Sequence, residues 1–337
     1  MTAVLPHPPA ASEPDVRLSR RLRGPGEFGW IWIALIALFV VSAIVAPGST
    51  SGSALINMLP FAGVLAIAAV GQTLVVQQRG LDLSVAGGIT MAGILTGYLT
   101  TRGVSLPLSL IVAALAGLLA GAFNGFLVAR LSITPLVATL ASNALIIGAV
   151  RQISGGFPVS ASPALSDFAR GRFLGVPITV LVALVFIIAA TLITRRAVIG
   201  RRFVAVGASE STARAAGIPD VRYKIGTYAA AGLCYAFAGV ILAGFIGTAT
   251  PVMGNDYLLP TIAAVVVGGT PFTGGRGSVV ATAAAALFLT QLGQLVLTLG
   301  APNSIQLLAQ AIALVLATAI RHIPFSRLRR STMDAKR

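Results

Sequence analysis

The chain has 337 residues, of which 56% are hydrophobic and only 10% are charged, and its formal net charge is +15. A soluble domain carries roughly 25% charged residues, so this composition excludes an ordinary soluble enzyme and predicts an all-α polytopic membrane protein. The basic charge does not predict nucleic-acid binding, because no basic cluster is interleaved with aromatic residues on a soluble domain; the positive-inside bias of membrane proteins explains it better.

The two ends of the chain are polar. Residues 1–26 are rich in Pro and Arg and have no apolar period, which predicts a disordered, basic cytoplasmic tail. Residues 321–337 predict a second basic cytoplasmic tail. The stretch between them, 27–320, is the predicted transmembrane domain.

Ten apolar segments are candidate spans, because a spanning helix needs roughly 20 mainly apolar residues. With both termini in the cytoplasm, twenty of the 24 Lys and Arg residues lie inside, which is the expected bias. The eighth segment is too short to cross comfortably and is typical of a half-helix or a tilted segment. The segments are 28–46, 54–76, 84–101, 107–128, 135–150, 176–194, 225–248, 257–269, 278–299 and 304–320.

The longest polar interruption is the loop 194–224, which holds seven of the Lys and Arg residues and a short segment with its own helix signals. Ser209 can cap the segment, Glu210 adds a negative charge at its positive end, and Gly217 can adopt the left-handed conformation that ends a helix. A helix of about two turns is marginal alone in water, so it needs a surface on which to dock. The loop is either a coupling element that meets a partner protein or an amphipathic linker on the membrane.

The chain contains no evident source of energy. No Asp, Glu, Lys, Arg or His lies well inside a predicted span, whereas ion-coupled transporters usually keep such residues there. The phosphate-binding pattern G-x-x-x-x-G-K-[ST] is absent, Cys234 is the only cysteine, and no His, Cys or carboxylate cluster exists. We therefore expect no catalytic residue, metal site or cofactor in this chain, and uphill transport would need a separate motor that contacts the loop 194–224.

Several neutral polar residues interrupt the spans, where they could line a hydrated pathway for an uncharged polar solute. The preferred candidates are Asn57, Asn124 and Gln294. Each could equally form an interhelical hydrogen bond that packs the bundle.

Two short motifs lie beside the spans. In GLDLS, residues 80–84, Asp82 or Ser84 is expected to cap the third span and Arg79 to pair with Asp82, with a substrate contact as the alternative. Asn255 and Asp256 are expected to cap the eighth segment. The glycine-rich stretch GGTPFTGGRG, residues 268–277, is either a hinge or gate or a plain tight turn.

Four motifs in this order resemble the permease subunits of ribose-type sugar importers, within the ATP-binding-cassette group (type II) that also includes branched-chain amino-acid permeases. They are GLDLSV (80–85), NGFLVARLSITPLVATLA (124–141), GRRFVAVGASESTARAAGI (200–218) and IAAVVVGGTPFTGGRGSVV (262–280). The resemblance covers most of residues 55–320. It departs at Gln291-Leu292-Gly293-Gln294, where related chains carry an Asn-Asn-Gly-type run, and at Ala281, where they carry Gly, so ribose itself does not follow.

The resemblance implies that residues 200–218 hold a coupling helix that sits in a cleft of a cassette ATPase. The matching positions are Gly200, Gly207, Glu210, Ala213, Ala216 and Gly217, and the predicted cap Ser209 completes the coupling set. It also implies a bacterial inner membrane, a second permease subunit that is identical or paralogous, an extracytoplasmic solute-binding protein, and ATP and Mg bound by the ATPase.

We therefore expect a permease subunit that translocates a neutral polar solute, with a monosaccharide as the first choice. The alternatives are a passive channel or secondary facilitator in which the loop 194–224 is only regulatory, and an importer permease for a nucleoside or a branched-chain amino acid.

Overall fold

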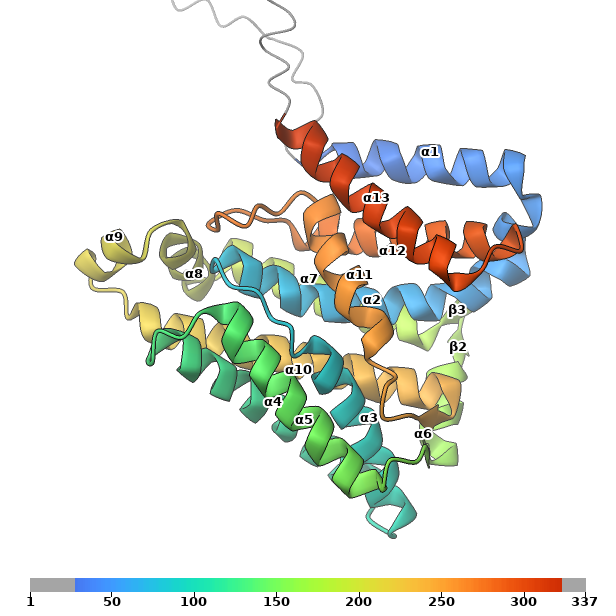
Figure 1. Ribbon diagram of the computed structural model, residues 1–337, viewed down its shortest axis with the longest axis horizontal. Coiled ribbons are helices and arrows are strands. Elements are labelled where there is room, and N and C mark those ends of the chain that lie inside the picture. Colours follow the sequence, from blue (N-terminus) through green and yellow to red (C-terminus); the bar gives the residue numbers. More distant parts are fainter. Residues whose placement is uncertain (1–27, 323–337) are drawn as a thin grey trace, which may run out of the picture.

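The computed structural model describes residues 28–322, so the predicted tails 1–26 and 321–337 lie almost wholly outside the described residues. The all-α prediction is confirmed. The described residues form thirteen α-helices, one short 3-10 helix and four strands of two residues each (Figure 1).

Each of the ten predicted apolar segments coincides with a helix. Six of these helices, α2, α4, α5, α7, α10 and α12, are long and apolar enough to cross a membrane. The short α11 has 13 residues, or about 20 Å at 1.5 Å per residue, and cannot cross a hydrocarbon core of about 30 Å, as the half-helix prediction requires. The ten helices are α1 (Trp30–Val45), α2 (Gly52–Gln77), α3 (Val85–Thr101), α4 (Leu106–Ala129), α5 (Pro135–Ser154), α7 (Ile178–Arg196), α10 (Asp220–Ile246), α11 (Asn255–Val267), α12 (Val279–Thr298) and α13 (Asn303–His322).

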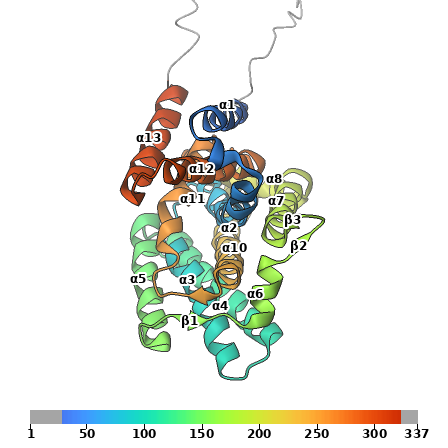
Figure 2. The same cartoon turned by 90° about the vertical axis from the view of Figure 1, so that its right-hand side faces the viewer.

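Helices α2 and α10 form the centre of the bundle (Figure 2). Both are largely buried within the protein, whereas α7 and α4 leave wide apolar faces exposed. Helix α4 approaches α10 closely through Gly117, Gly121 and Gly125, because a Cβ at any of them would overlap the backbone of α10. Such small-residue contacts are typical of helix packing in membranes.

Short elements close the two ends of the bundle. At one end lie α6 (Pro163–Arg170), the pairing of β1 (Val159–Ser160) with β4 (Thr248–Ala249), and the hairpin of β2 (Arg172–Phe173) and β3 (Val176–Pro177). At the opposite end α8 (Val198–Ala208) and α9 (Glu210–Ala215) project beyond the long helices (Figure 1). A short 3-10 helix, Pro47–Thr50, joins α1 to α2.

Helices α6 and α8 are absent from the sequence-based prediction. The signal for α6 is local, since Ser162 caps it and Pro163 occupies its first turn. The signal for α8 is weaker. Its buried residues Phe203, Val206 and Gly207 recur at helical spacing, but the charges of Arg201 and Arg202 hide the period.

Candidate coupling surface and solute cavity

Helix α9 begins and ends as its sequence predicts. The Ser209 hydroxyl accepts a hydrogen bond from the Thr212 backbone N–H at 3.3 Å, and Glu210 lies in the first turn. At the other end Gly217 has a φ of +76°, and the N–H groups of Gly217 and Ile218 donate to the carbonyls of Arg214 and Ala213. These two bonds form a complete Schellman cap, so the six-residue helix is defined at both ends.

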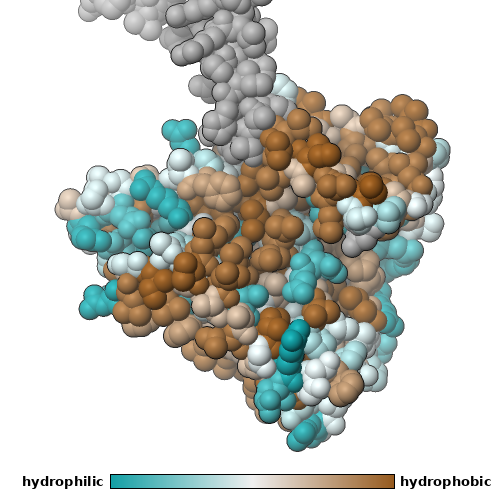
Figure 3. Space-filling view, in the orientation of Figure 1, coloured by the Kyte–Doolittle hydropathy of each residue, from teal (hydrophilic) through white to brown (hydrophobic). Residues whose placement is uncertain are grey.

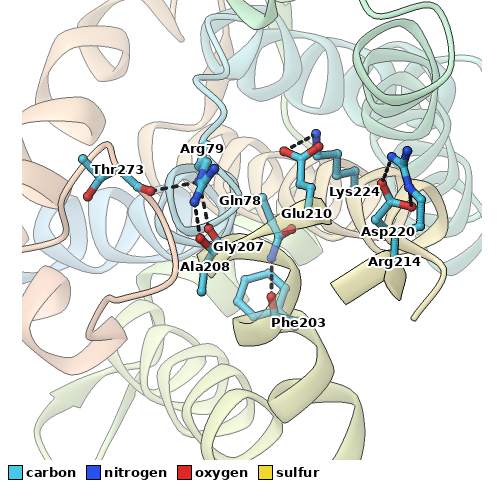
Figure 4. Close-up of polar contacts among 10 residues, drawn as sticks. All are labelled: Gln78, Arg79, Phe203, Gly207, Ala208, Glu210, Arg214, Asp220, Lys224 and Thr273. Atoms are coloured by element: carbon cyan, nitrogen blue, oxygen red, sulfur yellow. Dashed lines mark hydrogen bonds and ion pairs between the residues drawn. The ribbon is translucent and has the colours of Figure 1, made fainter. Parts of the chain in front are cut away.

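Two ion pairs attach α9 to the start of α10 (Figure 4). The Arg214 guanidinium lies 2.6 Å from the Asp220 carboxylate, and the Lys224 ammonium lies 2.7 Å from that of Glu210. The hydrogen bond to Asp220 raises the pKa of Arg214 above its ordinary value. Because the Arg214 side chain is 69% exposed, solvent screens this pair and it contributes little to stability.

The seven residues of the predicted coupling set divide into two groups. Gly200, Gly207 and Ala213 are buried within this chain, where they shape the segment. A Cβ at Gly200 would overlap the last turn of α7, and one at Gly207 would overlap the Gln77 carbonyl. The other four form the outer surface of the segment: Ser209 and Glu210 are half-buried, and Ala216 and Gly217 are exposed.

A cluster at the end of α2, which we call the clamp, holds α8 in place (Figure 4). Arg79 donates from Nε to the Gly207 carbonyl at 3.0 Å and from its guanidinium to the Ala208 carbonyl. The preceding Gln78 donates from Nε2 to the Phe203 carbonyl at 2.6 Å. The cation lies at the negative end of the α8 dipole, where it satisfies carbonyls that have no partner within the helix.

The clamp overturns the expected pairing of Arg79 with Asp82. Arg79 has a φ of +60°, which turns its side chain toward α8 and toward the Thr273 carbonyl, to which Nε donates at 3.0 Å. Asp82 instead accepts from the N–H and the hydroxyl of Ser84, the residue just before α3.

The glycine-rich loop 268–277 packs against the clamp. Gly274 and Gly275 both have positive φ, and the Gly275 N–H donates to the Gln77 carbonyl at 2.9 Å. A Cβ on Gly274 would overlap the Arg79 side chain. The loop is therefore a tight, glycine-dependent turn that joins α11 to the same cluster as α2 and α8.

Asn57 and Gln294 line one cavity of about 540 Å³, within the size range of small-molecule sites. Polar side chains from four helices converge on it: Asn57 (α2), Asp256 (α11), Thr290 and Gln294 (α12), and Gln306 and Gln310 (α13). Phe61, Tyr257, Leu242, Leu289 and Met253 are among its apolar and aromatic walls.

Asn124 does not line this cavity. Its side chain is fully buried, and its Nδ2 donates to the Ser84 hydroxyl at 2.8 Å. The packing alternative therefore fits Asn124, which joins α4 to the Gly80–Ser84 segment.

Helix α11 begins at the cavity, where Asn255 and Asp256 are exposed. Neither Asn255 nor Asp256 caps it through a side-chain hydrogen bond, so that expectation is wrong, and Asp256 instead faces the cavity from the first turn. The Gly254 N–H before it donates to the Thr90 hydroxyl of α3 at 3.0 Å. No feature of the isolated sequence distinguishes a cap from a cavity carboxylate here.

Three helices run between the clamp region and the cavity. Helix α2 carries Asn57 near its start and leads into Gln78 and Arg79 at its end. Helix α10 starts at the ion pairs with α9 and reaches the cavity at Leu242 and Ile246, and α11 runs from the cavity to the loop 268–277.

Comparisons with known proteins agree with this architecture. Residues 54–318 match the family described as the permease component of branched-chain amino acid transport systems. The chain is 35% identical to the galactofuranose transporter permease protein of Escherichia coli K12, with 88% of this chain and 89% of that protein covered. It is 30% identical to the ribose import permease protein of Bacillus subtilis 168 (86% and 91% covered) and 32% identical to the autoinducer 2 import system permease protein of Escherichia coli K12 (89% and 94%). No solved structure shows a significant match.

Proposed function

Because the chain belongs to the family of permease components of branched-chain amino acid transport systems, we propose that it is the membrane subunit of an ATP-binding-cassette importer that translocates a monosaccharide. Its relatives are named as permeases for galactofuranose, ribose and autoinducer 2. We further propose that it lies in a bacterial inner membrane with both termini in the cytoplasm, in keeping with its distribution of Lys and Arg.

The main support for the proposal is the position of α9 at the surface of the protein and the contacts that hold it there. It stands outside the bundle, is capped at both ends, is tied to α10 by two ion pairs and rests on a segment that the clamp fixes to α2. A helix attached in this way, with Ala216 and Gly217 exposed directly after it, is suited to receive force from a partner. We propose that this partner is a cassette ATPase that binds ATP and Mg.

The cavity supports a neutral, hydroxylated solute. Amide side chains both donate and accept hydrogen bonds, so Asn57, Gln294 and Gln306 can match the hydroxyl groups of a sugar. An amino acid needs a partner for its carboxylate, yet within the described part of the chain no Lys, Arg or His lines the cavity. This difference favours the sugar over the branched-chain amino acid.

A second permease subunit, identical or paralogous, is proposed to cover the face shown in Figure 3. This face is broadly hydrophobic, and it includes exposed leucine and isoleucine residues of α5 and α13. A hydrophilic patch interrupts it near the start of α11, where Asn255 and Asp256 are exposed. Polar groups facing lipid are unfavourable, so a protein partner fits this face better than lipid alone. An extracytoplasmic solute-binding protein would deliver the solute at the end that carries α6.

The coupling proposal is tested by Ala216→Arg, which adds bulk and charge to the outer surface of α9 without entering the packed side of the segment. We expect the assembled transporter to lose co-purification with its ATPase, or to hydrolyse ATP without uptake. The matched control is Ala164→Arg, the same change on the exposed surface of α6 at the opposite end, which should leave co-purification with the ATPase unchanged. Normal ATPase binding and normal uptake in the Ala216 variant would contradict the proposal.

Reconstitution distinguishes the importer from a passive facilitator. The importer requires the ATPase, the binding protein and ATP for uptake into liposomes. Uptake by the purified chain alone would select the facilitator instead. Moving the transporter from mostly one conformation to mostly the other requires about 5 kcal/mol of differential binding. The ATP-driven closure of the partner would have to supply this free energy.

A further inference from the structure

A single charged side chain, that of Asp256, is present among the described residues that line the cavity. We propose that Asp256 is a specificity-determining residue that accepts hydrogen bonds from hydroxyl groups of a neutral solute and excludes anionic solutes such as sugar phosphates and sugar acids. The inference rests on the proposed role of the cavity as the solute pathway and adds to it the chemical class that can enter.

The carboxylate is held in place by the way α11 begins. Asp256 lies in the first turn, at the positive end of the helix dipole, where a negative charge is favourable. The start of the helix is fixed to α3, because the Gly254 N–H donates to Thr90 and a Cβ on Gly254 would overlap the Ala86 carbonyl. The charge therefore has a defined position and does not belong to a mobile loop.

The surroundings of Asp256 leave its negative charge dominant. The other polar residues of the cavity wall are neutral amides and hydroxyls, and the rest of the wall is apolar or aromatic. Pro260, one turn further on, has no N–H to donate to the Asp256 carbonyl. An ionised carboxylate is an acceptor only, so it is complementary to hydroxyl groups, and it can accept from two neighbouring hydroxyls at once.

The same charge acts against an anion. A phosphate or carboxylate that entered the cavity would meet the charge of Asp256, with no cation among the described lining residues to offset it. A neutral polyol has no such barrier. The cavity therefore separates a sugar from its phosphorylated or oxidised form by charge, even where the rest of the molecule is identical.

The test measures the electrostatic potential of the cavity with thiol reagents of opposite charge. Cys234 is the only cysteine and is buried, so Gln294→Cys in a Cys234→Ala background gives one reactive thiol at the cavity wall. The full chain in membranes is treated with a cationic trimethylammonium and an anionic sulfonate methanethiosulfonate, and the two labelling rates are compared. Asp256→Asn is then added, with Asp167→Asn on α6 as the matched control that removes an exposed carboxylate outside the cavity.

We expect the cationic reagent to label the introduced thiol faster than the anionic one, and Asp256→Asn to reduce that rate ratio roughly tenfold while Asp167→Asn leaves it unchanged. An unchanged ratio in the Asp256 variant, with labelling intact, overturns this inference and leaves the permease proposal standing. If neither reagent nor a neutral analogue labels the introduced thiol, the cavity is not an aqueous pathway, and the proposed route of the solute fails with it.

Discussion

The clamp at the end of α2 makes a quantitative prediction for Arg79→Ala. The substitution removes the bonds from Arg79 to the carbonyls of Gly207, Ala208 and Thr273. Hydrogen bonds to a charged group contribute about 1.5–3 kcal/mol each, but two of these are exposed to solvent and must be discounted. We therefore expect the contact between α8 and α2 to lose about 2–3 kcal/mol.

Hydrogen–deuterium exchange of the reconstituted protein measures this loss directly. If α8 opens locally, amides of its last turn should exchange about 30- to 150-fold faster in Arg79→Ala, while those of the buried centre of α10 remain unchanged. Arg79→Lys keeps the charge at the helix end but not the forked geometry, so its exchange rates should lie between those of wild type and those of Arg79→Ala. Arg222→Ala, which removes an exposed arginine at the same end, is the control. Equal exchange in wild type and Arg79→Ala, or an equal effect of Arg222→Ala, would refute the clamp.

Three further predictions concern neighbouring positions. Gly207→Ala should lower the melting temperature by several degrees because its Cβ overlaps backbone, whereas Gly226→Ala, which meets no atom within 4 Å, should be neutral or slightly stabilising. Asn124→Leu should destabilise the protein by about 1–3 kcal/mol through its lost buried hydrogen bond, whereas Gln294→Leu should reduce uptake and leave thermal unfolding nearly unchanged. Arg214→Gln should accelerate exchange of α9 amides only about two- to fivefold, because its ion pair is screened, and added salt should remove the difference from wild type.

The sequence predicts the spans well because the length of an apolar run is a local property. Each of the ten segments becomes a helix, and α9 has the cap and the terminating glycine that its residues indicate. Helix α8 is not predicted from the sequence for two reasons. Its buried face forms only when it packs on the clamp, and charged residues hide its apolar period. The predicted pairing of Arg79 with Asp82 is wrong for a related reason, because the partners of Arg79 are backbone carbonyls more than a hundred residues away.

The polar residues of the spans show where single-sequence reasoning stops. Asn57, Asn124 and Gln294 are chemically similar, and whether each faces a cavity or a neighbouring helix depends on packing that the sequence does not state. A usable signal exists for Asn124, because it lies on the same helical face as Gly117 and Gly121, where close contact with α10 leaves no room for a solute. The opposite signal, which would mark Asp256 as a cavity residue, is absent, because α11 is placed by contacts with other helices, namely α2, α12, α13 and α3.

Two prolines suggest how force at α9 could change the cavity. In residues 28–322, the helices with an interior proline are α2 and α11, and both Pro60 and Pro260 lie at the cavity end of their helix. Proline removes one intrahelical hydrogen bond and permits a bend, and each of these helices is fixed to the clamp region at its far end. A displacement of α8 and α9 would move the fixed ends of α2 and α11 together. Each helix would then change its angle at its proline, beside Met58 in α2 and Tyr257 in α11, and both of these residues line the cavity. The helices that would receive the motion and those that line the cavity are thus the same two, so movement at α8 and α9 would reach the proposed solute site without an intermediate element.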